Sequence, residues 1–354
     1  GFLCDDPARS TNETCINQDV VDKLTELREL HRARPGDDDR WRVLQYSRAI
    51  RALRAHPTRI TTEAQARTLD GVGAKTANKI LEIVRTGELR RLKYADTEDV
   101  RVVRLFNGIY GAGLQISWRW YAAGARTLDD LRAKRFGIKL SRVQRIGLHF
   151  YDADINTRMP RSEARAIFEA IKPVALKLDP DLFVEIMGSY RRGKATCGDI
   201  DILLSRPTAD GRTHAGILLR LLDALHAAGI LTEDLAIPDA DDALEGVYRG
   251  LCVRPGDERK VRRRIDILAV PWTSRGAALV YYTGDDIFNR SMRLKASKMG
   301  YSLNQRGLYA GVVRAVDDRT KKTCEGKLIA SETEEAIFSA LGVSWQEPHE
   351  RARG

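Results

Sequence analysis

The stretch that decides the fold of this chain is GSYRRGKATCGDID, residues 188–201. Asp199 and Asp201 stand two positions apart in a segment that is predicted to be a strand, so both side chains project from one face. Two carboxylates held side by side repel each other unless a cation lies between them. Mg²⁺ prefers hard oxygen ligands and often bridges to substrate phosphates. The spacing predicts a metal site, although an Asp-x-Asp pair alone is usually the solvated face of a strand.

A third acid and a phosphate-binding turn complete the pattern. Asp266 lies in another predicted strand, directly after three arginines, and three carboxylates from adjacent strands suit a site for two metal ions. The Gly-Ser turn at 188–189 and Arg192 offer amides, a hydroxyl and a cation for phosphate groups. One ion would activate an attacking hydroxyl, and the other would hold a triphosphate and neutralise the leaving pyrophosphate.

The composition is that of an ordinary globular protein. The 354 residues are 43% hydrophobic and 31% charged, with a formal net charge of +10. No apolar run approaches the roughly 20 residues of a bilayer-spanning helix, so no membrane partner is expected. Five scattered cysteines without a Cys-x-x-Cys pair favour a reducing, intracellular setting over a disulfide framework or a zinc site. A start at Gly1 without Met leads us to expect that upstream modules were trimmed.

The positive charge is concentrated in one segment. Residues 1–39 hold 5 basic and 10 acidic side chains, whereas residues 40–93 hold 13 basic and 4 acidic ones. Lys and Arg contacts release counterions from phosphates, so such a basic block is typical of a polyanion-binding surface. A solvated helix face is the alternative, and charge alone does not decide between them.

Two glycine turns lie in the first 150 residues, whose hydrophobic spacing predicts a run of short helices. They are Gly71-Val72-Gly73 and Gly111-Ala112-Gly113. Glycine permits close approach of the backbone to a ligand, and the start of the following helix offers N–H groups to a phosphate. The turns resemble the helix-hairpin-helix motif, which grips DNA phosphates without reading bases and often binds Na⁺ or K⁺. One turn would be weak evidence; two copies strengthen it.

The chain as a whole resembles the family X DNA polymerases. The resemblance rests on residues 188–201, on Asp266 and on YYTGDDIFNR, residues 281–290, and it covers essentially the whole chain. It implies a multidomain fold of class α and α/β. The implied domains are a helical lyase domain (1–94) with the first hairpin turn, helical fingers (95–157) with the second, a nucleotidyltransferase palm with a mixed sheet (158–270) and an α+β thumb (271–354).

The resemblance also implies roles for individual residues of the palm and thumb. Asp199 and Asp201 would bind both metal ions, two Mg²⁺ or possible Mn²⁺ substitutes, and Asp266 would complete the ion that activates the primer 3′-OH. The nucleotide-binding residues would be Arg158, Ser189, Arg192 and Gly198 around the triphosphate, Tyr281 and Tyr282 at the sugar, Asp286 in the same pocket, and Asn289 and Arg293 at the minor-groove edge of the nascent pair. Core packing is the alternative for the two tyrosines.

In the helical part, Lys75 and Lys79 lie four residues apart on one helix face. The resemblance places Lys79 as the Schiff-base nucleophile that removes a 5′-deoxyribose phosphate. A lysine crowded by positive charge has the lowered pKa that this chemistry requires, although a solvated basic face is the alternative. The expected DNA contacts are Trp41, Arg42, Tyr46 and Lys75 at the 5′-phosphate side of a gap, and Gly71, Gly73, Gly111 and Gly113 at the hairpin turns.

Together these implications describe a monomeric, nuclear, template-dependent DNA polymerase with lyase activity. It would use dNTPs to fill short gaps in double-stranded DNA that carries a 5′-phosphate, in base excision repair and non-homologous end joining. End-joining factors would bind through an N-terminal BRCT domain that is absent from this chain.

Three alternatives remain open. The first is a template-independent terminal transferase or a mu-like end-joining polymerase; the pair Tyr281-Tyr282 differs from the Gly-Trp of those enzymes, and residues 235–250 hold no long insertion to replace a template. The second is a DNA-binding scaffold without catalysis, which the intact set of three aspartates disfavours. The third is a poly(A)-type transferase, which would leave the paired hairpin turns unexplained. Tyr282 also departs from the Phe of similar family members, and Asp286 stands at a variable position.

Overall fold

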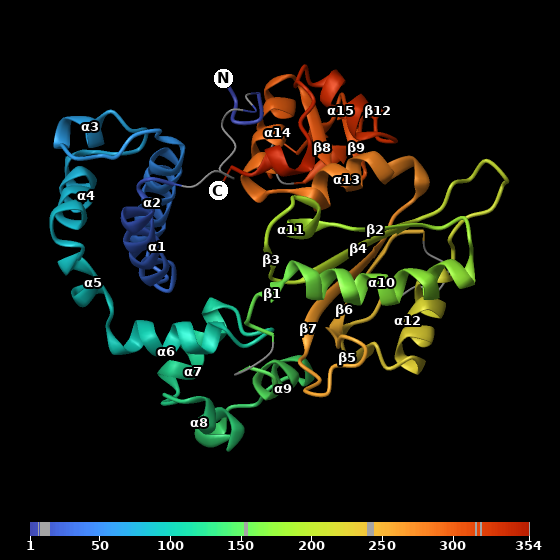
Figure 1. Cartoon of the computed structure of the whole chain (residues 1–354), viewed down its shortest axis with the longest axis horizontal. Helices are drawn as coiled ribbons and strands as arrows, with labels where there is room; N and C mark the ends of the chain where they lie inside the picture. The colour runs from blue at the N-terminus through green and yellow to red at the C-terminus, as the bar shows by residue number, and fades with distance from the viewer. Residues whose placement is uncertain are drawn as a thin grey trace. The chain divides into compact units, whose positions relative to one another are not determined.

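The computed structural model describes residues 1–5, 7, 15–151, 155–238, 244–315, 317–318 and 321–353 (Figure 1). Residues 239–243 of the 235–250 segment therefore lie outside the described residues. The chain forms two compact units, Thr11–Asp152 and Gly1–Ser10 with Ala153–Gly354. The first is helical and the second combines helices with a mixed sheet, which confirms the predicted multidomain α and α/β class.

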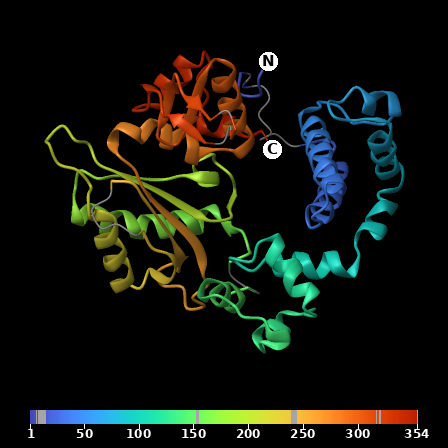
Figure 2. The ribbon, with the colours of Figure 1, turned by 180° about the vertical axis from the view of Figure 1, so that it is seen from behind.

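Short helices make up the first unit. They are α1 (Gln18–Arg32), α2 (Asp37–Ala55), α3 (Glu63–Arg67), α4 (Ala74–Thr86), α5 (Arg90–Ala95), α6 (Glu98–Asn107), α7 (Leu114–Ala122), α8 (Leu128–Arg132), the 3-10 helix η2 (Arg135–Gly137) and α9 (Arg142–His149). Helices α1 and α2 lie side by side in both views (Figures 1 and 2). Val20, Leu24 and Leu27 recur at helical spacing on α1 and are fully buried. One apolar cluster joins α1, α2 and α4, and a second joins α6 to α9.

A five-stranded sheet forms the centre of the second unit, with strand order β2-β4-β7-β6-β5. Its strands and the neighbouring elements are β1 (Met159–Pro160), α10 (Arg161–Leu178), β2 (Phe183–Ile186), α11 (Gly188–Arg191), β3 (Thr196–Cys197), β4 (Ile200–Ser205), α12 (Ile217–Ala227), β5 (Leu231–Ala236), β6 (Gly246–Cys252) and β7 (Arg263–Ala269). Strands β4 and β7 are parallel, and the other pairs are antiparallel. Side chains of β4 alternate between two apolar clusters, so Ile200 and Ile202 face α10 and α12 while Leu203 faces α13.

The C-terminal elements pack around a smaller core. They are η3 (Trp272–Ser274), α13 (Arg275–Thr283), α14 (Asp286–Lys298), β8 (Tyr301–Asn304), β9 (Gly307–Ala310), β10 (Val313–Arg314), β11 (Lys322–Cys324), β12 (Lys327–Ala330), α15 (Glu334–Ala340) and η4 (Pro348–Arg351). Phe288 of α14 stacks on Phe338 of α15, with ring centroids 6.0 Å apart. Strands β8, β9 and β12 form an antiparallel sheet. Among the described residues, no helix has the length and apolarity needed to cross a membrane.

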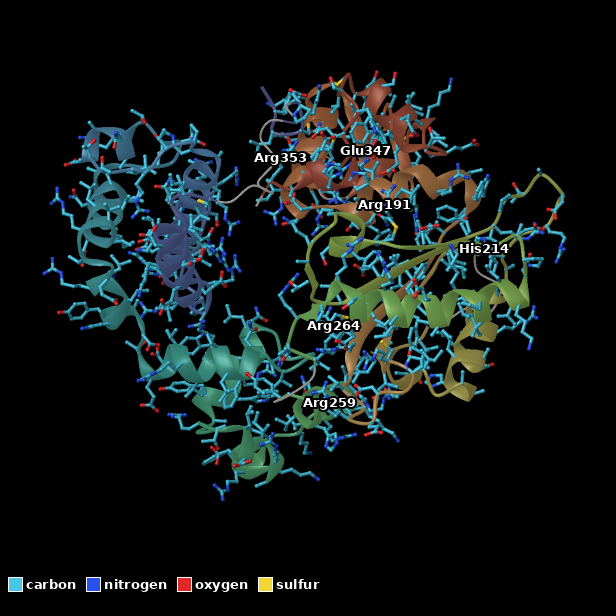
Figure 3. All side chains as sticks on the ribbon, in the orientation of Figure 1. Arg191, His214, Arg259, Arg264, Glu347 and Arg353 are labelled. Atoms are coloured by element: carbon cyan, nitrogen blue, oxygen red, sulfur yellow. The ribbon has the colours of Figure 1, made fainter. Side chains whose placement is uncertain are left out.

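The first residues of the chain belong to this C-terminal core, whereas the sequence division grouped them with the helical domain of residues 1–94. Cys4 is fully buried, and its N–H donates to Ser291 Oγ at 3.0 Å. Gln346 donates to the carbonyl of Cys4 at 2.7 Å, and Arg353, labelled in Figure 3, donates to the carbonyl of Leu3 at 2.9 Å. Periodicity could not reveal this arrangement, because the partners lie almost the whole chain away.

A buried carboxylate ties α11 to the C-terminal elements. Glu334 is only 4% exposed and accepts hydrogen bonds from Arg191 at 2.7 Å and from Arg351 at 2.6 Å. Burial raises the pKa of Glu334, but the hydrogen bond from Arg191 and the charge of Arg351 outweigh it and lower the pKa below its usual value. The carboxylate therefore compensates two guanidinium groups at once.

We expect Glu334→Gln to destabilise the second unit by about 3 to 5 kcal/mol, because it leaves Arg191 and the fully buried Arg351 without their counter-charge. Urea unfolding followed by tryptophan fluorescence measures the loss. Glu335→Gln is the matched control, since Glu335 is exposed on the same helix turn. Equal midpoints for the two variants would contradict the expectation.

Candidate active site

Two of the predicted carboxylates are direct neighbours across the sheet. Asp201 of β4 and Asp266 of β7 are register partners in the parallel pair, so their side chains share the face that α13 covers. Asp199 lies one residue before β4 begins, and its charge still acts on Asp201. The structure therefore places Asp201 and Asp266 side by side across the sheet, with Asp199 just before β4 and near enough for its charge to act on Asp201.

The Gly-Ser turn approaches Asp201 so closely that only glycine fits. Gly188 has a φ of +58°, and a Cβ at this position would lie 2.4 Å from Asp201 Oδ2. The N–H of Met187 donates to the carbonyl of Asp201 at 2.7 Å. The turn after β2 is thus fixed against the carboxylate by main-chain contact.

Two arginines that sequence reasoning did not select compensate the acidic cluster. Arg264 Nη2 lies 2.8 Å from Asp199 Oδ2, and Arg249 Nε lies 3.4 Å from Asp266 Oδ2. Figure 3 labels Arg264, which lies on β7 two residues before Asp266. That period-two spacing was the available signal, because it places both side chains on one face. Arg249 comes from β6, and only the strand register reveals it.

Burial and mutual repulsion perturb the carboxylates. Burial, followed by the charges of Asp199 and Asp266, raises the pKa of Asp201 to about 7. Burial also raises the pKa of Asp266, although Arg249 and Arg264 oppose the change. The charges of Arg264 and Arg192 lower the pKa of Asp201, but they do not outweigh burial and the repulsion from the other two aspartates.

The donor set fits a divalent cation. It offers several hard carboxylate oxygens on one face, and their mutual repulsion is the condition that a bound cation relieves. Within the described ranges, no three carboxylate, histidine or cysteine side chains stand together as a finished ligand set. Asp199 and Asp266 face arginines instead.

Arg158, Arg192 and Ser189 lie beside the carboxylates, and we call this group the phosphate-binding corner after the role that the sequence predicts for it. Arg158 donates to Thr196 Oγ1 at 2.9 Å and to the carbonyl of Thr196 at 2.6 Å, and its Nη1 lies 3.3 Å from where a Cβ of Gly198 would be. Arg192 donates to the carbonyl of Thr283. Burial, opposed by the charges of nearby aspartates, lowers the pKa of Arg192, and the charge of Arg158 adds to this. The two guanidinium groups therefore lie near each other. Ser189 lies on the short helix α11, and Arg192 is the residue that follows this helix.

Two of the predicted nucleotide-binding residues of α13 and α14 line a polar cleft of about 620 Å³. Tyr281 and Arg293 line this cleft, and the guanidinium of Arg293 lies 4.8 Å from the centre of the Tyr281 ring. Asn289 Nδ2 donates to the carbonyl of Tyr281 at 2.6 Å, while its buried Oδ1 has no hydrogen-bond partner among the described residues. Asn304 and Lys322 complete a polar lining that suits a nucleic-acid edge.

Tyr282 and Asp286 have different surroundings from Tyr281. Tyr282 packs against the apolar cluster of Met187, Leu203 and Leu268, and burial raises its pKa to about 12. This environment favours core packing, which was the alternative to a sugar contact for Tyr282. Asp286 is exposed and pairs with Arg290 one turn along α14, at 2.6 Å.

In the helical unit, Lys79 lies half-buried on α4 and donates to the carbonyl of Lys75 at 3.1 Å. Burial, and then the charges of Arg91 and Lys75, lower the pKa of Lys79. A lysine with a lowered pKa is the type of amine that attacks carbonyl carbon. Sequence reasoning missed Arg91, which is separated from Lys79 by twelve positions and lies on α5.

The other predicted DNA contacts of this unit differ in exposure. Trp41 is 64% exposed, so its ring is available for stacking. Arg42 pairs with Asp39 at 3.1 Å and with Asp38 at 3.7 Å. Tyr46 is buried and stacks on His31, with ring centroids 5.8 Å apart.

The two glycine turns have the same backbone geometry. Gly71 and Gly111 have φ values of +76° and +81°, which only glycine adopts readily. In each turn, the next residue donates its N–H to the carbonyl three residues earlier. Val72 donates to Leu69 at 3.1 Å, and Ala112 donates to Ile109 at 2.9 Å. Gly73 and Gly113 cap helices α4 and α7, and a Cβ on either would meet nothing within 4 Å. Each turn thus presents an open helix N-terminus, which suits a phosphate.

Comparison with known families assigns a domain to most of the chain. Residues 15–89 match a helix-hairpin-helix domain, residues 104–155 the fingers domain of DNA polymerase lambda, residues 158–272 the DNA polymerase beta palm and residues 278–352 the DNA polymerase beta thumb.

Three curated relatives align along most of the chain. DNA polymerase lambda of Rattus norvegicus is 38% identical over 99% of this chain, and DNA polymerase lambda of Arabidopsis thaliana is 36% identical over 95% of it. DNA nucleotidylexotransferase of Eulemur macaco is 28% identical over 87% of the chain. The aligned parts cover 58%, 62% and 63% of these proteins, so the chain spans about three fifths of their length.

We expect Asp201→Asn to stabilise the protein at alkaline pH when divalent cations are chelated. Between the ordinary aspartate pKa of 3.8 and about 7, the folded state keeps a proton that the unfolded state has lost, so the stability of the wild type falls as the pH rises. The variant lacks this loss and should gain roughly 2 to 4 kcal/mol over the wild type above neutral pH.

Thermal unfolding in EDTA at about pH 5 and pH 8.5 measures this difference. Asp223→Asn is the control, because Asp223 is exposed on α12. A gain for Asp201→Asn that is the same at both pH values would contradict the expected repulsion.

Proposed function

The chain belongs to the family X DNA polymerases, and we propose that it is a template-dependent DNA polymerase that fills short gaps during DNA repair. The observation that carries the proposal is the cross-strand pair of Asp201 and Asp266 beside the phosphate-binding corner of Arg158, Ser189 and Arg192. This arrangement has the parts that transfer of a nucleotidyl group to a hydroxyl requires. The substrates would be dNTPs and gapped or broken duplex DNA with a 5′-phosphate.

The proposed reaction follows from the order of these groups. Divalent ions, Mg²⁺ or Mn²⁺, bound by Asp199, Asp201 and Asp266 would activate the primer hydroxyl and neutralise the leaving pyrophosphate. Arg158 and Arg192 would bind the triphosphate with charge-assisted hydrogen bonds. Asp266 lies one strand farther from this corner than Asp201, so the primer 3′-OH would meet the site at Asp266.

The cleft beside α14 would test the geometry of the nascent base pair. Tyr281 and Arg293 line the same polar cleft, and Asn289 donates to the main chain of Tyr281 behind it. Hydrogen bonding at the minor-groove edge would test the shape of the nascent pair without reading its sequence, because all four pairs offer acceptors there. Asp286 and Tyr282 would contribute at the border of this pocket.

The helical unit supports a second proposed activity, 5′-deoxyribose-phosphate lyase. Lys79 Nζ would attack C1′ of the abasic sugar and form a Schiff base with loss of water. Removal of a C2′ proton would then break the C3′–O bond, so the downstream strand leaves with a 5′-phosphate, and hydrolysis of the Schiff base would free the sugar phosphate and Lys79. Its burial and the charges of Arg91 and Lys75 support the required neutral amine. Trp41, Arg42 and Lys75 would hold the DNA end, and the hairpin turns, with Na⁺ or K⁺, would hold the flanking phosphates.

Base excision repair and non-homologous end joining in the nucleus are the proposed settings, with the protein acting as a monomer. End-joining factors would bind through a BRCT domain outside this chain.

The second candidate function is template-independent terminal transfer, which the aligned DNA nucleotidylexotransferase makes worth testing. The same three carboxylates would serve both reactions, so only template dependence separates them.

We expect wild-type protein to fill a one-nucleotide gap next to a 5′-phosphate with the complementary dNTP and Mg²⁺. Asp266→Asn should lower the extension rate by more than the roughly 100-fold that loss of an outer-shell metal partner costs. Asp223→Asn is the control. Equal extension of single-stranded primers and gapped DNA would refute template dependence and favour the terminal transferase.

For the lyase, borohydride should trap the protein on an incised abasic site, and Lys79→Ala should abolish the trapped species. Lys93→Ala is a control from the same basic segment. If Lys79→Ala is trapped as well as the wild type, another amine is the nucleophile and the assignment is wrong.

A further inference from the structure

A cation stands in the same cross-strand row as the two sheet aspartates. Arg249 of β6 is the register partner of Asp266, which is in turn the partner of Asp201. The row across the sheet is therefore Arg249, Asp266, Asp201, with the positive charge at the β6 end. Arg249 is 47% exposed on its side chain, whereas Asp266 is 20% exposed. The guanidinium group thus reaches solvent beside a carboxylate of the site.

The order of strands fixes the side from which a primer would arrive. The phosphate-binding corner lies at α11, directly after β2, at the opposite end of this row from β6. In phosphoryl transfer, the attacking and leaving oxygens lie roughly in line on opposite sides of the phosphorus. Since the pyrophosphate would leave toward α11, the attacking 3′-oxygen and the primer behind it would lie toward β7 and β6.

We propose that Arg249 binds the phosphodiester that joins the last two primer nucleotides. This inference rests on the proposed polymerase function and adds a primer-positioning residue to it. The last phosphodiester is the first anion of the primer strand behind its 3′-OH, so it would be the nearest negative charge on the β6 side. Arginine recognises phosphate oxygens with charge-assisted, often bidentate, hydrogen bonds.

Charge balance supports the idea that Arg249 exchanges Asp266 for a primer phosphodiester as its partner. In the structure, Arg249 pairs with Asp266 at 3.4 Å, a longer separation than the 2.8 Å between Arg264 and Asp199. A divalent cation held by Asp266 would compensate its negative charge, and Arg249 would then need another anion. The primer phosphodiester supplies that charge, so neither Asp266 nor Arg249 is left alone.

Neighbouring arginines are less suited to this contact. Arg264 is engaged with Asp199, and its side chain is 35% exposed. Arg262 is 20% exposed and pairs with Glu233 of β5. Arg249, at 47% exposed, is more exposed than Arg264 or Arg262, which leaves its guanidinium group accessible to a strand of DNA.

The test removes one charge from the DNA and one from the protein. Two gapped duplexes with dideoxy-terminated primers are compared by fluorescence anisotropy in Ca²⁺, one with a natural last primer linkage and one with a neutral methylphosphonate there. For the wild type, we expect the methylphosphonate to weaken binding by roughly 10-fold, the effect of losing one charged hydrogen bond. For Arg249→Leu, both duplexes should bind equally, and Arg249→Lys should keep part of the difference.

Arg259→Leu is the matched control, because Arg259 is 83% exposed and lies on the loop before β7; it should keep the full methylphosphonate effect. The salt dependence of binding gives a second readout, since loss of one phosphate contact lowers the slope of log K against log salt by about 0.9. A methylphosphonate effect of equal size in the wild type and Arg249→Leu would overturn the inference.

Gap filling on unmodified DNA separates this outcome from failure of the proposed function. If wild-type protein fills the gap but Arg249→Leu retains the methylphosphonate effect, only the role of Arg249 is wrong. If wild-type protein neither binds nor fills gapped DNA, the polymerase proposal fails, and the inference fails with it.

Discussion

Repulsion among Asp199, Asp201 and Asp266 is the constraint on which the second unit depends. Three carboxylates on one edge of a buried sheet destabilise the fold unless cations or protons offset their charge. Parallel pairing of β4 with β7 forces Asp201 and Asp266 together. The absence of a side chain at Gly188 lets the turn after β2 close over Asp201. Arg264, Arg249 and the half-buried Arg192 lie near these carboxylates. Their positive charges offset part of the repulsion, so the fold tolerates a site that would otherwise destabilise it.

The two proposed chemistries depend on separate sets of neighbours. Lys79 owes its lowered pKa to burial in the helical unit and to Arg91 and Lys75 of that unit. Asp201 and Asp266 owe their raised pKa values first to burial in the sheet and then to the charges of neighbouring aspartates. Positive surroundings favour a neutral amine, while negative surroundings favour cation binding. The helical unit therefore provides the positive surroundings of Lys79, and the second unit provides the negative surroundings of the carboxylates.

Local chemistry was predictable from the sequence, and long-range pairing was not. The Gly-Ser turn, the three aspartates and the two hairpin turns follow from residue type and spacing, and the structure brings the aspartates together. Arg264 could have been selected from its period-two relation to Asp266. Arg249 could not, because its place beside Asp266 depends on the register of β6 with β7. The packing of Cys4 likewise depends on residues far along the chain, and Tyr282 packs against an apolar cluster that only the folded sheet defines.

The buried position of Cys4 has a consequence for biosynthesis. Cys4 and Ser291 are 287 residues apart in sequence, so the segment around Cys4 cannot find this partner until all the residues between them have been synthesised. At about 5 to 20 residues per second, this delay is on the order of tens of seconds. During translation the helical unit is able to fold while Phe2 and Cys4 remain uncovered. The C-terminal core therefore closes after the helical unit, and its closure joins segments that lie 287 residues apart.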